Sequence, residues 1–172
     1  MNEELSEKTG RIVEMLEREG LDAVLLNARH NFAWLTCGGT NGVDTSRENG
    51  VATLMVTREG RRYVIANNIE TPRMLAEEVP QACFEPLSFT WQAEKADGGT
   101  VSKTALSVLR PGAAIAADID IGGGVPTIEG KVAACRHRLT ADEAVRFRRL
   151  GSDAGAAMRR AFFFNDTAAT EI

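Results

Sequence analysis

Few residues of this 172-residue chain are spaced for chemistry. Asp118 and Asp120 are alternate residues of a predicted strand, so both side chains share a face and could hold a metal ion; aspartates placed this way more often end a strand. The histidines are His30 and His137, and neither has a Ser or Cys placed as a nucleophile by a local motif. We interpret His30 as a cap of a short helix, with contact to a substrate as the alternative. No complete catalytic constellation is present.

Two further motifs point away from chemistry. Residues 124–131 look like a phosphate-binding loop, but five residues separate the glycines instead of four, and Val132 stands where a Ser or Thr should bind magnesium. Cys37, Cys83 and Cys135 lie far apart, with no CxxC pair and no His at zinc spacing. We interpret them as small core residues in a reducing compartment.

Charge and hydropathy exclude several classes of partner. Lys plus Arg is 20 and Asp plus Glu is 24, so the net charge of −4 gives no general attraction to nucleic acid. The basic residues near the C-terminus alternate with acidic ones, as on a solvated helix face. No apolar run approaches the roughly 18 residues of a membrane span, and the acidic, amphipathic first 20 residues are not a signal peptide. We expect a cytoplasmic protein with neither nucleic acid nor membrane as a partner.

The elements that must position these residues are organised around residues 21–42. A near-continuous apolar run from Leu21 predicts a strand buried on both faces. A polar turn over residues 27–30, a short apolar helix and a glycine loop from Cys37 to Gly42 follow. An amphipathic helix precedes the strand over residues 2–19.

The rest of the pattern predicts an α/β fold. Two strands over residues 51–57 and 63–66, joined by a turn containing glycine, predict an antiparallel hairpin. We therefore expect a mixed sheet, mostly parallel with one antiparallel hairpin, flanked by helices. The local expectations are a helix over 70–78, a short strand at 83–84 ended by Pro86, a loop over 87–99, a helix over 100–109 capped by Thr100, a strand over 113–121, and either helix or strand over 125–134.

The C-terminal part begins with a helix start signal. Thr140 and Glu143 form a predicted capping box, in which each side chain satisfies a backbone N–H of the other residue. Phe147, Leu150 and Met158 share one stripe of the helix that follows. Three successive Phe residues from Phe162 then break the pattern, because neighbouring helical residues point about 100° apart. Residues 165–172 look like a translated sequencing adapter that differs from its usual reading frame at one position.

Residues 21–39 resemble the N-terminal domain of the creatinase / Xaa-Pro aminopeptidase family of metallopeptidases, the "pita-bread" enzymes. In that family a strand written D-a-l-l-v is followed by N-i-x-Y-L-T-G. The matching positions here are Asp22 to Leu26 and Asn31 to Thr36, with Trp34 in place of Tyr, Cys37 inserted and Gly38 one place late. The first helix and the hairpin also fit that domain. A second match covers residues 139–161, which resemble the helix that opens the family's catalytic domain.

The resemblance implies a specific activity for a longer parent protein. Its active site would be a pair of divalent metal ions, manganese or cobalt, held by two Asp, one His and two Glu beyond Ala161. Such metals activate a bridging water against an amide carbonyl. The resemblance also implies that the N-terminal domain helps to form a homodimer and overhangs the partner's active site. His30, Asp44 and Arg47 would then line the substrate entrance.

We therefore expect three segments: an N-terminal-like domain over residues 1–138, the first helix of a missing catalytic domain over 139–161, and an adapter artefact over 162–172. This fragment should be inactive without a metal site of its own, and the parent should be a hydrolase acting on a peptide or small amide. Two alternatives stay open. One is a stand-alone, non-enzymatic α/β dimerisation or scaffold module, and the other is the N-terminal domain of a creatinase-type C–N hydrolase.

Overall fold

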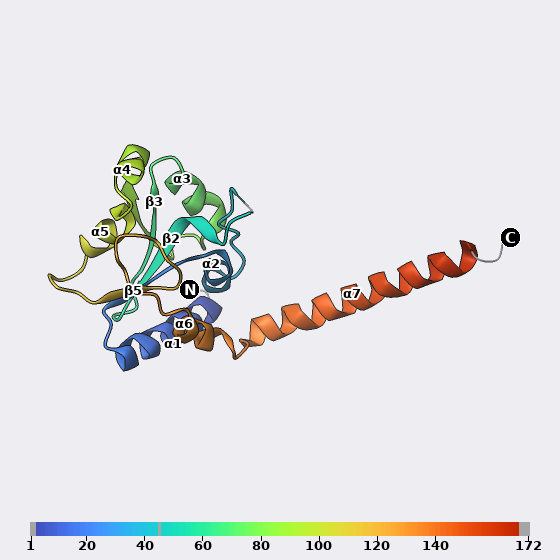
Figure 1. Ribbon diagram of the computed structural model, residues 1–172. Helices are drawn as coiled ribbons and strands as arrows, with labels where there is room; N and C mark the ends of the chain where they lie inside the picture. Colours follow the sequence, from blue (N-terminus) through green and yellow to red (C-terminus); the bar gives the residue numbers. More distant parts are fainter. Residues whose placement is uncertain (1–2, 45, 169–172) are drawn as a thin grey trace. The chain divides into compact units, whose positions relative to one another are not determined.

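The computed structural model describes residues 3–44 and 46–168, with side chains as far as Phe162. The chain divides into two compact units, Met1–His137 and Arg138–Ile172. The first unit holds a five-stranded sheet and its helices, and the second holds one long helix (Figure 1).

The sheet of the first unit has the strand order β4-β3-β2-β1-β5. β2 pairs antiparallel with both β1 and β3, whereas β4 pairs parallel with β3 and β5 pairs parallel with β1. The α/β class and the mixed sheet are confirmed. The expectation of a mostly parallel sheet is wrong, because β2 returns antiparallel to β1 and leaves equal numbers of the two pairings among the described strands. The strands are β1 (Ala23–Ala28), β2 (Asn49–Thr57), β3 (Arg62–Asn67), β4 (Glu85–Phe89) and β5 (Ile115–Ala117).

β1 is buried along its whole length, as its apolar run predicts. Val24 and Leu26 pack into one core, whereas Ala23 and Leu25 pack into a second core on the opposite face, because successive strand side chains point to opposite faces. α1 (Glu3–Glu19), α2 (Arg29–Thr36) and α6 (Glu129–Arg136) contribute Leu5, Phe32 and Val132 to the first core, and α5 (Thr100–Leu106) contributes Ala105 to the second. Helices therefore cover both faces.

The region of β4 differs from the sequence expectation. The strand begins at Glu85, passes through Pro86 and ends at Phe89, so the short strand predicted at residues 83–84 and the loop predicted over 87–99 are both wrong. β4 is an edge strand, and proline is tolerated there because one side of the strand needs no ladder hydrogen bond. α4 (Trp91–Ala96) follows, capped by Thr90, whose hydroxyl accepts a hydrogen bond from the Ala93 N–H at 3.3 Å.

Other local expectations are refined by the structure. The helix predicted over residues 70–78 is present as α3 (Thr71–Arg73) followed by a π-helical turn, η1 (Met74–Glu78). Thr100 does not cap α5, because its hydroxyl donates to the carbonyls of Asp97 and Ala93 instead. The strand predicted over residues 113–121 is reduced to β5. The segment left open between helix and strand contains α6, preceded by a single bridge between Thr127 and Ala117.

The second unit contains α7 (Ala141–Ala168). Its capping box is confirmed, since the Glu143 N–H donates to the Thr140 hydroxyl at 3.2 Å and the Thr140 N–H donates to the Glu143 carboxylate at 2.8 Å. If residues 162–172 are an adapter artefact, their side chains should pack against nothing specific. Most of these side chains lie outside the described residues, so this stays a prediction. Within residues 3–44 and 46–168, no helix has both the length and the apolar character that crossing a membrane requires.

Candidate functional site

The candidate site is built on the loop of residues 37–48, here called the glycine loop, which joins α2 to β2. Cys37 ends α2 in the left-handed conformation with φ of 64°, and its N–H donates to the Trp34 carbonyl at 3.3 Å. Gly39 then passes so close to η1 that a Cβ there would lie 2.3 Å from the Glu78 carbonyl oxygen. Only glycine fits this approach, so the beginning of the loop is fixed against η1.

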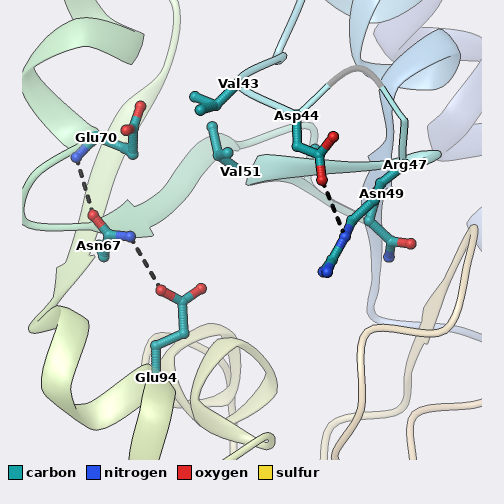
Figure 2. A pocket seen from close by; sticks show the side chains of 9 residues that line it. Val43, Asp44, Arg47, Asn49, Val51, Asn67, Glu70 and Glu94 are labelled. Atoms are coloured by element: carbon teal, nitrogen blue, oxygen red, sulfur yellow. Dashed lines mark hydrogen bonds and ion pairs between the residues drawn. The ribbon is translucent and has the colours of Figure 1, made fainter.

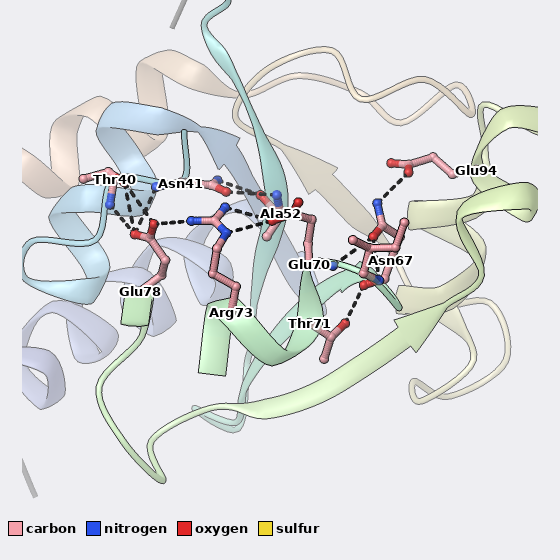
Figure 3. A network of polar contacts seen from close by, with 10 residues as sticks. Thr40, Asn41, Ala52, Asn67, Glu70, Thr71, Arg73, Glu78 and Glu94 are labelled. Atoms are coloured by element: carbon pink, nitrogen blue, oxygen red, sulfur yellow. Dashed lines mark hydrogen bonds and ion pairs between the residues drawn. The ribbon is translucent and has the colours of Figure 1, made fainter. Parts of the chain in front are cut away.

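Glu78 holds the same part of the loop through its side chain (Figure 3). Its carboxylate accepts hydrogen bonds from the Thr40 N–H at 2.6 Å, the Thr40 hydroxyl at 3.0 Å and the Asn41 N–H at 3.3 Å. Arg73 adds an ion pair at 2.7 Å. Burial by itself would raise the pKa of Glu78, but these hydrogen bonds outweigh it and hold the pKa below its ordinary value. Glu78 is therefore a charged anchor for the loop.

Asn41 ties the loop to the beginning of β2. It is fully buried, its side-chain amide donates to the Ala52 carbonyl at 2.8 Å, and its side-chain oxygen accepts from the Ala52 N–H at 2.9 Å. A Cβ on Gly50 would lie 1.9 Å from the Asn41 amide nitrogen, so the strand can come this close only at a glycine. The loop is thus fixed on two sides before its exposed part begins.

A pocket of about 300 Å³ lies beside the exposed part of the loop (Figure 2). Its walls come from four segments that are distant in sequence: the glycine loop, β2, the end of β3 with the start of α3, and α4. Val43 and Val51 form an apolar end, and polar side chains form the remainder. The polar lining residues are Asp44, Arg47, Asn49, Asn67, Glu70 and Glu94.

Two of the sequence-predicted site residues, Asp44 and Arg47, meet at this pocket. The Arg47 Nε lies 3.2 Å from an Asp44 carboxylate oxygen, and the other oxygen accepts hydrogen bonds from the Ser46 hydroxyl at 2.6 Å and the Ser46 N–H at 3.0 Å. The Ser46 hydroxyl, followed by its N–H, lowers the pKa of Asp44, with smaller contributions from Arg47 and Arg29. Asp44 is therefore ionised and paired at neutral pH.

The opposite wall contains residues that the sequence did not single out. The Asn67 side-chain oxygen accepts from the N–H groups of Ile69 and Glu70, both at 3.0 Å, and its amide donates to Glu94 at 3.1 Å. Glu70 in turn pairs with Arg73 at 2.8 Å. Thr90, the N-cap of α4, was the available signal for a helix carrying Glu94.

His30 lies outside the lining of this pocket. Its Nδ1 is 3.7 Å from a Glu48 carboxylate oxygen and its Nε2 is 3.5 Å from a Glu129 carboxylate oxygen. It does not cap α2: the N-cap position is Ala28, which makes no side-chain capping bond. The three predicted site residues thus separate into a pair, Asp44 with Arg47, and a histidine between two glutamates.

Asp118 and Asp120 are not arranged as a metal-binding pair. Asp118 is buried, and its carboxylate accepts hydrogen bonds from the N–H groups of Asn27 at 2.8 Å and Ala28 at 3.1 Å, and from the Asn31 amide at 2.8 Å. Burial raises its pKa despite these donors. The Asp120 carboxylate accepts from the Gly122 N–H instead. In the described part of the chain, no group of three or more His, Cys, Asp or Glu could hold a metal ion.

No protein-family model and no curated protein sequence matches the chain. Solved structures do match. The chain is similar to an Xaa-Pro dipeptidase from Bacillus anthracis with a TM-score of 0.59 and 15% identity, over 93% of this chain and 43% of that chain. The fold is that of an Xaa-Pro peptidase N-terminal domain.

This chain also gives weaker matches to two shorter solved chains. An Xaa-Pro aminopeptidase (aminopeptidase P) from Streptococcus thermophilus gives a TM-score of 0.48 and 16% identity, over 77% of this chain and 98% of that one. An Xaa-Pro aminopeptidase from Streptococcus pyogenes gives a TM-score of 0.48 and 15% identity, over 79% of this chain and 100% of that one. The chain spans less than half the length of the dipeptidase that it matches over 93% of its own length.

Proposed function

We propose that residues 1–138 are the N-terminal domain of a metal-dependent hydrolase similar to Xaa-Pro aminopeptidases and dipeptidases. The observation that carries this proposal is the fold similarity to the Bacillus anthracis Xaa-Pro dipeptidase, which extends over 93% of this chain but only 43% of that enzyme. The motif order of residues 21–39 and 139–161 supports the same assignment. The substrate of the parent is then a peptide or a small amide.

The role we propose for the domain is dimerisation and shaping of the substrate entrance. The glycine loop suits an entrance, because Glu78 and Asn41 fix its base while Asp44 and Arg47 stay exposed beside a pocket. His30 lies beside Glu48 of the same loop, 3.7 Å away. A loop with a fixed base and an exposed polar part can orient a substrate without taking part in the chemistry.

The metal ions belong to another part of the parent in this proposal. The described residues do not fit two divalent ions, since they contain no ligand cluster and the buried Asp118 already accepts three N–H donors. We place the two Asp, one His and two Glu ligands, and with them manganese or cobalt, beyond residue 161. The present chain then hydrolyses no peptide, and the parent acts as a homodimer in the cytoplasm.

The decisive experiment is to sequence the uninterrupted gene downstream of codon 161 and to assay its product. We expect the five metal ligands within the next few hundred codons. We also expect Xaa-Pro dipeptide hydrolysis that chelators abolish and manganese or cobalt restores. The present chain should show no hydrolysis with either metal. A gene without the ligand set would contradict the proposal and favour a stand-alone module.

A further inference from the structure

The pocket beside the glycine loop combines an apolar end with an acidic side. Val43 and Val51 form the apolar end, and Val43 is 65% exposed although it is apolar. Asp44, Glu70 and Glu94 line the rest of the wall, together with one cationic residue, Arg47 (Figure 2). The lining therefore carries three carboxylates and one guanidinium.

The charges are not equally compensated. Arg47 pairs with Asp44 at 3.2 Å, and Arg73, behind the wall, pairs with Glu70 at 2.8 Å. Glu94 accepts only the neutral Asn67 amide within the described residues, at 3.1 Å. One carboxylate thus faces the pocket without a cation. A cationic ligand could form an ion pair with the Glu94 carboxylate, whereas an anionic ligand would have to compete with Asp44 for Arg47.

Size and shape restrict the ligand further. A volume of about 300 Å³ is at the lower end for ligand pockets, so the pocket suits a group as small as one amino-acid residue. Its apolar end can cover a short hydrocarbon chain while its acidic side receives the charge. Four segments of the first unit make the walls, so this combination exists only in the folded protein.

We propose that this pocket binds a primary ammonium group carried on a short aliphatic chain. The ammonium donates to the Glu94 carboxylate, and the aliphatic chain lies against Val43 and Val51. On a peptide, such a group is the amino terminus or a lysine side chain. The peptide as its source rests on the proposed function, whereas the pocket and its chemistry do not.

The test is a nuclear magnetic resonance titration of the ¹⁵N-labelled 172-residue chain at low salt. The three ligands, n-pentylammonium, 1-pentanol and pentanoate, have similar chains and differ in charge. We expect n-pentylammonium to shift the amides of Val43, Val51, Asn67 and Glu94 and to bind about two- to fivefold more tightly than 1-pentanol, as for one exposed charge pair. Added salt should remove this difference.

Two variants assign the effect to Glu94. Glu94→Gln keeps the size of the side chain and removes its charge, so n-pentylammonium should bind no better than 1-pentanol. Glu17→Gln removes one exposed carboxylate from α1, which contributes no residue to the pocket lining, and should leave the difference unchanged. Equal binding of n-pentylammonium and 1-pentanol, tighter binding of pentanoate, or equal loss in both variants would overturn the proposal.

Two further ligands distinguish an amino terminus from a lysine side chain as the source of the ammonium group. Norleucine amide carries the charge only on its α-amino group, and Nα-acetyl-lysine amide carries it only on its side chain. Binding by either ligand with the same Glu94 dependence supports a peptide as the source. If neither ligand binds, a peptide is not the source of the ammonium group. If the downstream gene encodes no metal ligands, the proposed function is wrong. The proposed ammonium binding would still stand, since n-pentylammonium binding does not depend on hydrolysis.

Discussion

The Glu78 carboxylate accepts the Thr40 backbone N–H at 2.6 Å, although 38 positions separate the two residues. This contact fixes the glycine loop to η1. Because Arg73 pairs with both Glu78 and Glu70, the same network reaches the wall of the pocket (Figure 3). The Glu78 carboxylate therefore connects the base of the loop to the wall of the pocket.

Glu78→Ala should destabilise the first unit by about 1–3 kcal/mol, because it leaves the buried Asn41 N–H and the part-buried Thr40 N–H without their acceptor. Urea unfolding followed by circular dichroism measures the loss. Glu77→Ala is the matched control, since Glu77 is the exposed neighbour, and it should change the free energy of unfolding by no more than about 0.5 kcal/mol. Equal effects at the two positions would contradict the anchoring role of Glu78.

Glu78 also predicts a pH dependence. Its folded pKa lies below the ordinary value of 4.5, so its contribution is complete above that pH and is lost as the pH falls through the folded pKa. The difference in unfolding free energy between the native chain and Glu78→Gln should shrink as the pH is lowered below 4.5. A difference that stays constant with pH would show that the Glu78 charge is not what stabilises the loop.

The raised pKa of Asp118 predicts a pH dependence of stability that is opposite to that of Glu78. Burial raises its folded pKa above the ordinary value of 3.8, so its contribution is complete below that pH and is lost as the pH rises through the folded pKa. The cost of Asp118→Asn should therefore be larger near the ordinary pKa than at neutral pH, as measured by urea unfolding at each pH. A cost that grows as the pH rises would mean that the three N–H donors outweigh burial.

Gly50→Ala should cost about 1–3 kcal/mol of unfolding free energy, as overpacking does, because its Cβ would lie 1.9 Å from the Asn41 amide nitrogen. Gly10→Ala is the matched control: Gly10 lies in α1 with nothing within 4 Å of an added Cβ, so it should stabilise by about 0.5–1 kcal/mol. If both substitutions stabilise the protein, β2 does not approach the glycine loop as closely at Gly50 as the structure indicates.

The exposed apolar side chains of α7 lead us to expect that this chain self-associates. Phe147, Leu150 and Met158 are 59%, 63% and 59% exposed, and covering each side chain contributes about 1.5–3 kcal/mol. Light scattering should show a mass that rises with concentration, and Phe147→Glu should reduce it. Ser152→Glu adds the same charge to α7 at an exposed serine and should not. A monomer at all concentrations would contradict this prediction.

In the longer parent that we propose, Asp44→Ala and Arg47→Ala should raise KM more than they lower kcat. An entrance loop that binds substrate and transition state alike changes binding without changing the chemical step. Steady-state kinetics with an Xaa-Pro dipeptide measures the two constants. A fall in kcat with an unchanged KM would place these residues in the chemistry instead.

The sequence by itself determined the elements that depend on neighbouring residues. The buried strand β1, the hairpin of β2 with β3, the first helix and the Thr140–Glu143 capping box all follow from periodicity or from side chains within a few positions. The beginning of the glycine loop was also predictable, because Gly38, with φ of 141°, and Gly39, which approaches the Glu78 carbonyl, hold positions that other residues do not favour. The role of Asp44 and Arg47 at a substrate entrance stays a prediction.

Only the tertiary structure decided which distant residues meet. Pro86 lies in a strand because β4 is at the sheet edge, and local sequence does not indicate an edge position. The Ala28 N–H is taken by Asp118, 90 positions away, and not by a cap from His30. The pocket likewise joins the glycine loop to Glu94 across β2 and β3. These contacts follow from strand order and packing, which periodicity along the chain does not specify.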